Sequence, residues 1–95
     1  MEIKDYPNYI IYPDGRIKKI NGHKKGFMKI NIDRGYYKLG LTNENGYTKF
    51  RLHRLLAQHY IPNPNNYDEV DHIDGNPLNN DLSNLRWCNR SINNQ

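Results

Sequence analysis

Cysteine and long apolar runs are the features that this sequence most clearly lacks. It has one cysteine, Cys88, which excludes an internal disulfide framework and a four-cysteine zinc site. Its longest apolar runs, such as residues 9–12, fall far short of the roughly 20 residues that a membrane span needs. No basic segment followed by an apolar one opens the chain, so we see no secretory signal. We therefore expect a reducing compartment and no membrane partner.

Hydrophobic residues are also scarce. They make up 36% of the 95 residues, and the mean hydropathy is −1.02, so a large apolar interior is not available. Such a composition can indicate disorder. Aromatic residues, however, make up 12% of the chain and include eight tyrosines, which favours a folded protein. We expect one small domain, or one small domain with a short partner module.

Charge is divided unevenly between the two parts of the chain. Residues 1–52 contain eleven Lys or Arg and five Asp or Glu, whereas residues 53–95 contain three and five. One part of the chain is basic and rich in tyrosine, and the other contains acids and histidines. This division suits a protein that binds a polyanion with one part and acts on it chemically with the other. The alternative is a solvated, lysine-rich surface without a partner, because a net charge of +4 is modest.

The first part of the chain reads as short strands joined by turns. Pro13-Asp14-Gly15 is a turn signal, because Pro presets φ and Gly accepts a positive φ. Residues 27–32 alternate apolar and polar, as a half-buried strand does. Asn45-Gly46 is a strong hairpin signal. We expect two small hairpins or a meander, with strands over residues 9–12, 16–20, 27–32, 36–41 and 47–52.

The spacing of apolar residues changes at His53. Leu52, Leu55 and Leu56 begin a helical pattern that predicts a helix over residues 53–61, and Pro62 ends it. Asn is a favoured N-cap, so a further helix is predicted to begin at Asn89. Between the two helices we expect a strand over residues 67–71, a polar loop over 73–81 and a return strand over 82–88.

The most specific part of the sequence is a set of short polar motifs in the second half. They are Asp71-His72-Ile73-Asp74-Gly75-Asn76, then residues 79–87 (Asn-Asn-Asp-Leu-Ser-Asn-Leu-Arg-Trp), then Asn93-Asn94. This constellation closely resembles the HNH nucleases, whose active site is a strand–loop–strand–helix unit around one metal ion. Residues 52–64 resemble the segment that precedes this unit in phage and intron-encoded HNH homing endonucleases. Residues 11–16 are similar to the small DNA-binding module often fused before it.

The resemblance covers nearly the whole chain and implies its architecture. It implies an α+β fold, with a small N-terminal β-hairpin module and a helix followed by a ββα-metal motif. Residues 1–52 would form the basic, β-rich DNA-binding module, and residues 53–95 the nuclease motif with its preceding helix. The resemblance also implies a location in the cytoplasm of a bacterial or phage-infected host cell.

The residue types suit hydrolysis of a phosphodiester by in-line attack of water. His72 is the natural base, because a histidine with the ordinary pKa of about 6.5 is mostly neutral at pH 7–8 and can take a proton from water. Asp71 and Asn93 offer hard oxygen ligands that suit Mg²⁺ or Mn²⁺. By resemblance, Asp71 and Asn93 match the metal positions and His72 the general base. Asn84 matches the middle Asn, which ties the loop to its own backbone and holds His72 in line.

Two details of this site carry structural expectations. Adjacent side chains on a regular strand point to opposite faces. Asp71 and His72 can therefore serve one site only where the strand ends or distorts, which we expect at these two residues. Many HNH enzymes carry His at the last ligand position, where this chain has Asn93, and an amide oxygen can still bind the ion.

The function implied is that of a metal-dependent HNH homing endonuclease that uses one Mg²⁺ or Mn²⁺ ion. It would nick double-stranded DNA and leave 5′-phosphate and 3′-hydroxyl ends. Two alternatives stay open: a DNA-binding module that kept the fold with weak or no cleavage, and a small structural domain with no nucleic-acid partner.

The candidate DNA contacts are cations from both parts of the chain. Lysines read phosphate charge rather than base identity, and arginines beside the site could clamp phosphates. We favour structural roles for His53 and His59 on the first helix, with a DNA contact by His53 as the alternative. We expect Trp87 to anchor the core and Cys88 to pack there as a small apolar side chain. The candidate DNA-binding set is Arg16, Lys18, Lys19, Lys24, Lys25, Lys29, Arg86 and Arg90.

Overall fold

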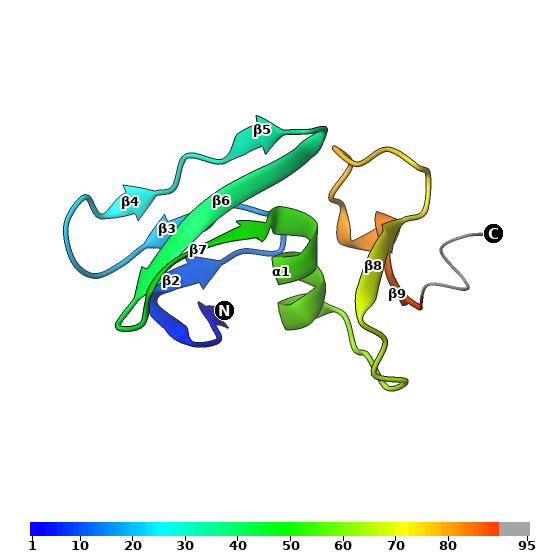
Figure 1. Cartoon of the computed structure of the whole chain (residues 1–95), viewed down its shortest axis with the longest axis horizontal. Helices are drawn as coiled ribbons and strands as arrows, with labels where there is room; N and C mark the ends of the chain where they lie inside the picture. The colour runs from blue at the N-terminus through cyan, green and yellow to red at the C-terminus, as the bar shows by residue number, and fades with distance from the viewer. Residues whose placement is uncertain (90–95) are drawn as a thin grey trace.

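The structure, a computed structural model, describes residues 1–89. Within these residues, an α-helix lies between N-terminal β-sheets and a C-terminal two-stranded hairpin (Figure 1). The predicted α+β class is confirmed. The strands are β1 (Glu2–Ile3), β2 (Tyr6–Ile11), β3 (Ile17–Lys19), β4 (Gly26–Phe27), β5 (Asn31–Asp33), β6 (Tyr36–Asn43), β7 (Gly46–Arg51), β8 (Glu69–His72) and β9 (Leu85–Cys88). The helix is α1 (Leu52–Tyr60), and a short 3₁₀ helix spans Leu82–Asn84.

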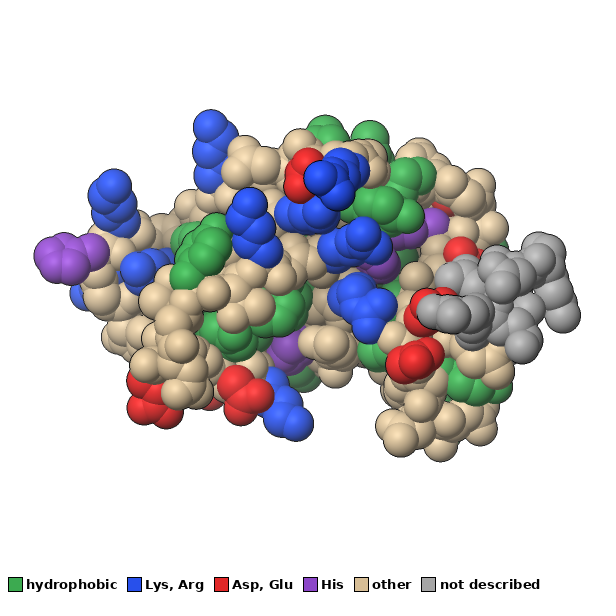
Figure 2. All heavy atoms as spheres, in the orientation of Figure 1, with side chains coloured by type: hydrophobic (Ala, Val, Ile, Leu, Met, Phe, Trp, Pro, Cys, Tyr) green, Lys and Arg blue, Asp and Glu red, His purple; other side chains and the backbone are tan. Residues whose placement is uncertain are grey.

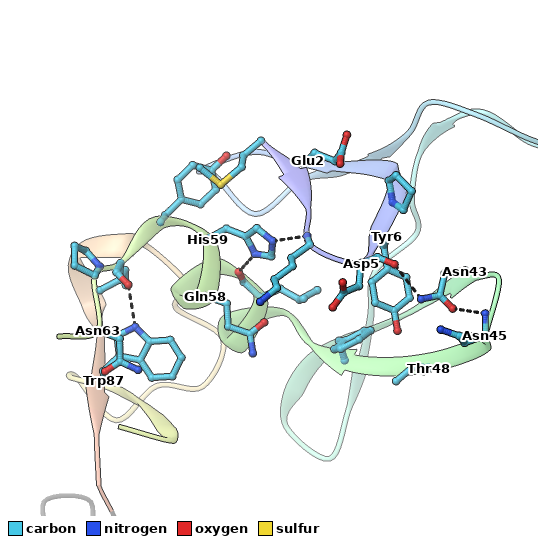
Figure 3. Close-up of a pocket in the computed structure, with 18 of the residues that line it drawn as sticks. Glu2, Asp5, Tyr6, Asn43, Asn45, Thr48, Gln58, His59, Asn63 and Trp87 are labelled. Carbon is cyan, nitrogen blue, oxygen red and sulfur yellow. Dashed lines mark hydrogen bonds between the residues drawn. The ribbon is translucent and has the colours of Figure 1, made fainter. Parts of the chain in front are cut away.

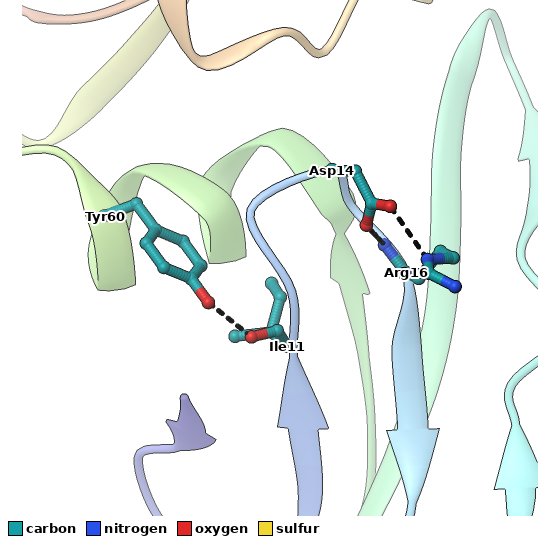
Figure 4. Close-up of polar contacts among 4 residues, drawn as sticks. All are labelled: Ile11, Asp14, Arg16 and Tyr60. Atoms are coloured by element: carbon teal, nitrogen blue, oxygen red, sulfur yellow. Dashed lines mark hydrogen bonds and ion pairs between the residues drawn. The ribbon is translucent and has the colours of Figure 1, made fainter.

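The hairpin of β2 and β3 forms as predicted around Pro13-Asp14-Gly15. Gly15 has a φ of 94°, which the turn requires. The Asp14 carboxylate accepts hydrogen bonds from the backbone N–H and the Nε of Arg16, at 3.0 and 2.8 Å, and closes the turn (Figure 4). Ile11 and Ile17 pair across the two strands and are both fully buried. The four-stranded sheet follows chain order, β1-β2-β3-β4.

The single strand predicted over residues 27–32 is wrong. β4 ends at Phe27 in the first sheet, and β5 begins at Asn31 in the second. The apolar alternation has another cause, because Met28 and Ile30 pack against the core while the backbone passes from one sheet to the other. Directly after β4, the Met28 N–H donates to the Ile17 carbonyl of β3 at 2.7 Å.

The second predicted hairpin is confirmed. β6 and β7 pair in register from Lys38 with Arg51 to Asn43 with Gly46, and β5 adds to the other edge of β6. Leu39 and Leu41 of β6 are buried, whereas most of β7 is exposed. At the turn, the Asn43 side-chain oxygen accepts from the N–H of Asn45 at 2.9 Å.

Helix α1 follows β7 directly and joins the sheets to the C-terminal hairpin. It agrees with the predicted helix to within one residue at each end. It ends at Tyr60, and the extended backbone of the C-cap residue Ile61 leads into Pro62. Its apolar face belongs to a core cluster that also contains residues of β1, β2, β3, β6, β8 and β9. Two bonds secure its C-terminal end: the Tyr60 hydroxyl donates to the Ile11 carbonyl at 2.5 Å (Figure 4), and the indole of Trp87 donates to the Ile61 carbonyl at 3.0 Å. No helix within residues 1–89 has the length and hydropathy of a membrane span.

The C-terminal hairpin consists of β8, a loop and β9. The predicted polar loop over residues 73–81 is confirmed. The return strand predicted over 82–88 is shorter, because residues 82–84 form a 3₁₀ turn closed by the Asn84 N–H on the Asp81 carbonyl at 2.8 Å. The helix predicted from Asn89, with Arg90 and Asn93, lies outside the described residues.

Candidate functional site

Asp71 and His72 are the last two residues of β8. They pair in regular register with Arg86 and Leu85 of β9, and the strand ends at His72 without distorting before it. Burial alternates along β8, with His72 buried and Asp71 partly exposed. The two neighbouring side chains therefore leave opposite faces of the hairpin, and the structure does not bring them into direct contact.

Asp71 forms an ion pair with the residue directly across the hairpin. Its Oδ2 accepts from Nη2 of Arg86 at 3.0 Å and from Nε at 3.2 Å. The two side chains are 27% and 49% exposed, so the pair lies at the surface. Surface pairs of this kind contribute about 0–1 kcal/mol, so a competing partner can replace either member at small cost.

His72 is enclosed by groups from three other parts of the chain. The residue is 7% exposed, and its Nε2 lies 2.8 Å from Oδ1 of Asn80 in the polar loop. The centroid of its ring lies 4.6 Å from that of the His53 ring and 6.2 Å from that of the Tyr36 ring. Sequence spacing could not reveal these neighbours, because they come from β6, from α1 and from a loop rich in asparagine.

His53 is a buried, neutral neighbour of His72. Burial, and then the nearby His72, Arg51 and Arg54, lower the pKa of His53 from 6.5 to about 4. Tyr36 stacks on its ring at 5.5 Å, and the guanidinium of Arg51 lies 4.5 Å from the Tyr36 centroid. With 4% of its surface exposed, His53 packs in the interior beside His72.

Asn84 organises the loop between β8 and β9. Its side-chain oxygen accepts from the N–H of Asp74 at 3.0 Å, and its Nδ2 donates to the Asp74 carboxylate at 3.0 Å and to the Asn79 carbonyl at 2.8 Å. Hydrogen bonds from the Asn79 side chain, the Asn76 backbone and the Asn84 side chain also lower the pKa of Asp74. Within residues 1–89, Asn84 makes no side-chain hydrogen bond to His72; Asn80, one residue beyond Asn79, makes that contact.

Of the two predicted metal ligands, Asp71 lies within the described residues and Asn93 lies outside them. Within residues 1–89, no three His, Cys, Asp or Glu side chains form a cluster that could hold a metal ion. Asp71 itself suits a hard divalent cation, because its donors are carboxylate oxygens and both contacts from Arg86 go to Oδ2.

Basic side chains of the predicted DNA-binding set gather on the first sheet and its turn. The Arg16 guanidinium lies 5.0 Å from the Phe27 ring centroid, and the Lys18 ammonium lies 5.6 Å from it. In Figure 2, Lys and Arg side chains spread over the upper and central parts of the visible face, while several Asp and Glu side chains lie at its lower left and on its right side. Sequence reasoning left out Arg51, an exposed residue at the end of β7 whose guanidinium lies over Tyr36, beside His53 and His72.

A separate groove lies between the N-terminal strands, the end of α1 and Trp87 (Figure 3). His59 lies in it, with Nε2 accepting from the Lys4 N–H at 3.0 Å and Nδ1 donating to the Leu55 carbonyl at 2.8 Å. Both ring nitrogens of His59 are thus used by the backbone, and none of the predicted site residues within residues 1–89 lines the groove.

Comparison with known proteins agrees with the resemblance. Residues 50–95 match the model of a family described as HNH endonuclease. An uncharacterized HNH endonuclease of Acanthamoeba polyphaga mimivirus is 40% identical over 88 residues, which cover 93% of this chain and 26% of that protein. The DNA endonuclease I-HmuI of Bacillus phage SP01 is 36% identical over 96 residues, which cover 97% of this chain and 53% of the phage protein.

A solved structure shares the fold. It is described as "DNA binding and cleavage by the HNH homing endonuclease I-HmuI", and it matches with a TM-score of 0.84 and 32% identity over 98% of this chain. That match covers 53% of the solved chain. The present chain thus spans about half the length of the phage relative, and a smaller share of the mimivirus relative.

Proposed function

Because the chain belongs to the HNH endonuclease family, we propose that it acts as a metal-dependent DNA endonuclease of the homing type. His72 would be the general base, and Asp71 and Asn93 would hold one Mg²⁺ or Mn²⁺ ion. Asn84 would hold the loop on which the site depends. The observation that carries the proposal is the β8–loop–β9 unit, in which a buried histidine ends the first strand and Asn84 fixes the loop after it.

The opposite orientations of Asp71 and His72 are compatible with in-line displacement. In such a reaction the attacking and leaving oxygens lie on opposite sides of the phosphorus atom. A base serves the attacking water, whereas a metal ligand serves the leaving side, so the two groups need not touch. A phosphate placed at the end of β8 could then be reached by His72 from one face and by Asp71 from the other.

Arg86 has to release or share Asp71 when an ion binds. A guanidinium freed in this way stays next to the site and can bind a phosphate oxygen, which is the role predicted for it. When bound, the ion would polarise the phosphate and stabilise the departing 3′-oxygen. The remaining residues of this chain position the DNA and accept the proton from water.

The basic surface provides the DNA contacts in this proposal. Lys and Arg side chains bind phosphates without reading sequence, so the substrate is double-stranded DNA held largely by charge. A nick is the expected product, because one site with one general base cuts one strand. The contacts would come from Arg16, Lys18, Lys19, Lys24, Lys25, Lys29, Arg86 and Arg90, the last of which lies outside the described residues.

The test is conversion of supercoiled plasmid to the relaxed form. With Mg²⁺ or Mn²⁺ we expect relaxation that EDTA abolishes and that His72→Ala removes without loss of DNA binding. His23→Ala is the matched control, because His23 is an exposed histidine in the loop between β3 and β4. Plasmid that is retarded in a gel but stays supercoiled would support the alternative, a DNA-binding module without cleavage. The ion pair between Asp71 and Arg86 is the observation that favours this alternative.

A further inference from the structure

We propose that Asn80 is a positioning residue for His72, and that it makes Nδ1 the ring nitrogen that takes the proton from water. The proposal rests on the proposed role of His72 as general base. It adds a residue that the motif comparison did not select, and it assigns the reacting atom of the ring.

The contact between the two side chains defines their roles. Nε2 of His72 lies 2.8 Å from Oδ1 of Asn80, the distance of a normal hydrogen bond. An amide oxygen only accepts, so with Oδ1 of Asn80 facing the ring the hydrogen belongs on Nε2. A neutral imidazole has one N–H and one free lone pair, which then belongs to Nδ1.

The loop holds Asn80 in place before any substrate arrives. The carbonyl of Asn79, the preceding residue, accepts from Nδ2 of Asn84 at 2.8 Å, and the Asn79 side chain donates to Asp74 at 2.9 Å. The backbone next to Asn80 is therefore anchored from two sides. An anchored acceptor loses little conformational freedom when it orients its partner.

The rings around His72 keep it from turning away from Asn80. A half-turn about the Cβ–Cγ bond would exchange Nε2 for a carbon atom and would break the hydrogen bond. His53 at 4.6 Å and Tyr36 at 6.2 Å pack around a ring that is 7% exposed, which opposes that rotation. His53 adds no charge at neutral pH, because burial and the neighbouring cations keep its pKa near 4.

In this step water is the proton donor, and the 3′-oxygen is the leaving group. Water gives one proton to Nδ1, and its oxygen forms a bond to phosphorus. The bond from phosphorus to the 3′-oxygen breaks, and that oxygen keeps the electron pair and takes a proton from solvent. The imidazolium formed on His72 keeps its Nε2–H bond to Asn80, and an amide oxygen stabilises a cationic donor more strongly than a neutral one.

Nuclear magnetic resonance of ¹⁵N-labelled protein without metal or DNA tests the assignment directly. In the wild type we expect the neutral His72 ring to carry its proton on Nε2, with an N–H signal protected from exchange with water. Asn80→Ala removes the acceptor, so this signal should be lost. Asn80→Asp keeps an oxygen at the same reach, so the signal should persist.

Plasmid cleavage by the same variants gives the second readout. Asn80→Ala should lower kcat by on the order of 10- to 100-fold, the size of effect found when the partner that orients a metal-bound histidine is removed. Asn80→Asp should restore most of this loss. Asn76→Ala is the matched control, because Asn76 lies in the same loop and bonds Asp74 and Leu78 instead of His72. It should change neither readout.

Failure of this proposal is distinguishable from failure of the proposed function. A wild-type ring protonated on Nδ1, in a protein that His72→Ala inactivates, would overturn the role of Asn80 and leave the nuclease intact. A His72→Ala protein that cuts like the wild type would overturn the base assignment itself. If Asn80→Ala does not fold, the wild-type and Asn80→Asp spectra still decide, because a ring without Nε2–H in both refutes the proposal.

Discussion

At the scale of single residues, His53 and His72 lie side by side but have different partners. His53 is held neutral by burial, with its pKa near 4, and Tyr36 covers its other side. His72 also lies inside the fold, but it ends a strand and bonds a loop. Two histidines of the same chemical type therefore serve as an inert packing group and as the proposed base.

The low pKa of His53 predicts a stability that falls with acid. The unfolded chain takes up this proton near pH 6.5, whereas the folded chain resists it until about pH 4. Stability should therefore decrease as the pH falls through this window, by about 2–3 kcal/mol between pH 7 and pH 4.5. Urea unfolding at both pH values should show the decrease in the wild type.

The matched protein for this measurement is His53→Phe. A phenyl ring can stack on Tyr36 but cannot titrate, so this share of the acid sensitivity should disappear. The comparison is between the two pH values within each protein, which cancels any packing change caused by the substitution. If both proteins lose the same free energy of unfolding between pH 7 and pH 4.5, the loss comes from other groups and the prediction is wrong.

The ion pair of Asp71 with Arg86 predicts competition between a side chain and a metal ion. Arg86→Met should tighten Mn²⁺ binding in the absence of DNA by up to about fivefold, because an exposed pair contributes about 0–1 kcal/mol. Calorimetry or the Mn²⁺ spin-resonance signal measures this affinity. Arg16→Met is the control, since Arg16 also forms a surface ion pair, with Asp14 in the first turn. Weaker binding in Arg86→Met would show that Arg86 helps the ion.

At the scale of elements, the loop between β8 and β9 depends on one buried side chain. Asn84 is 8% exposed and makes three hydrogen bonds to loop groups. Asn84→Ala leaves buried loop groups without partners and should lower the free energy of unfolding by about 1–3 kcal/mol. Thermal unfolding measures the loss, and Asn76→Ala, which removes an exposed contact, should cost much less. Equal losses would mean that Asn84 does not organise the loop.

Local sequence patterns predicted the two hairpin turns and helix α1, because neighbouring residues decide these structures. Pro13-Asp14-Gly15, Asn45-Gly46 and the leucines of α1 act through turn geometry and helical spacing, and all three features are observed. The prediction of one strand over residues 27–32 is wrong, because Met28 and Ile30 reach the core from a segment that passes between two sheets. An alternation of apolar residues reports burial, but it does not report which strand forms the hydrogen bonds.

The candidate site was predictable only in part, for the same reason. Asp71, His72 and Asn84 are close in sequence and belong to one recognisable motif. Asn80 was one of several loop asparagines, and His53 was a helical residue with a structural role. Their contacts with His72 depend on how α1 packs against the C-terminal hairpin, which no local pattern describes.

At the scale of the whole molecule, one core cluster joins the basic part of the chain to the hairpin that holds His72. Leu39 and Leu41 of β6 share it with Leu56 of α1 and with Val70 and Leu85 of the hairpin. DNA held on the N-terminal sheets would therefore have a fixed orientation relative to the proposed site. The predicted division at residue 52 stays a prediction, and α1 is the element that connects the two parts.

Charge on the N-terminal part predicts the salt dependence of DNA binding. If Lys24, Lys25 and Lys29 bind phosphates, each change to Gln should weaken binding to any duplex and lower the slope of log K against log salt by about 0.9. Fluorescence anisotropy with a labelled duplex at several salt concentrations measures both quantities. Lys4→Gln is the control of equal charge, because Lys4 lines the groove of Figure 3 together with Glu2 and Asp5. If Lys4→Gln lowers the slope as much as the other three changes, binding follows net charge alone, and the assigned phosphate contacts are wrong.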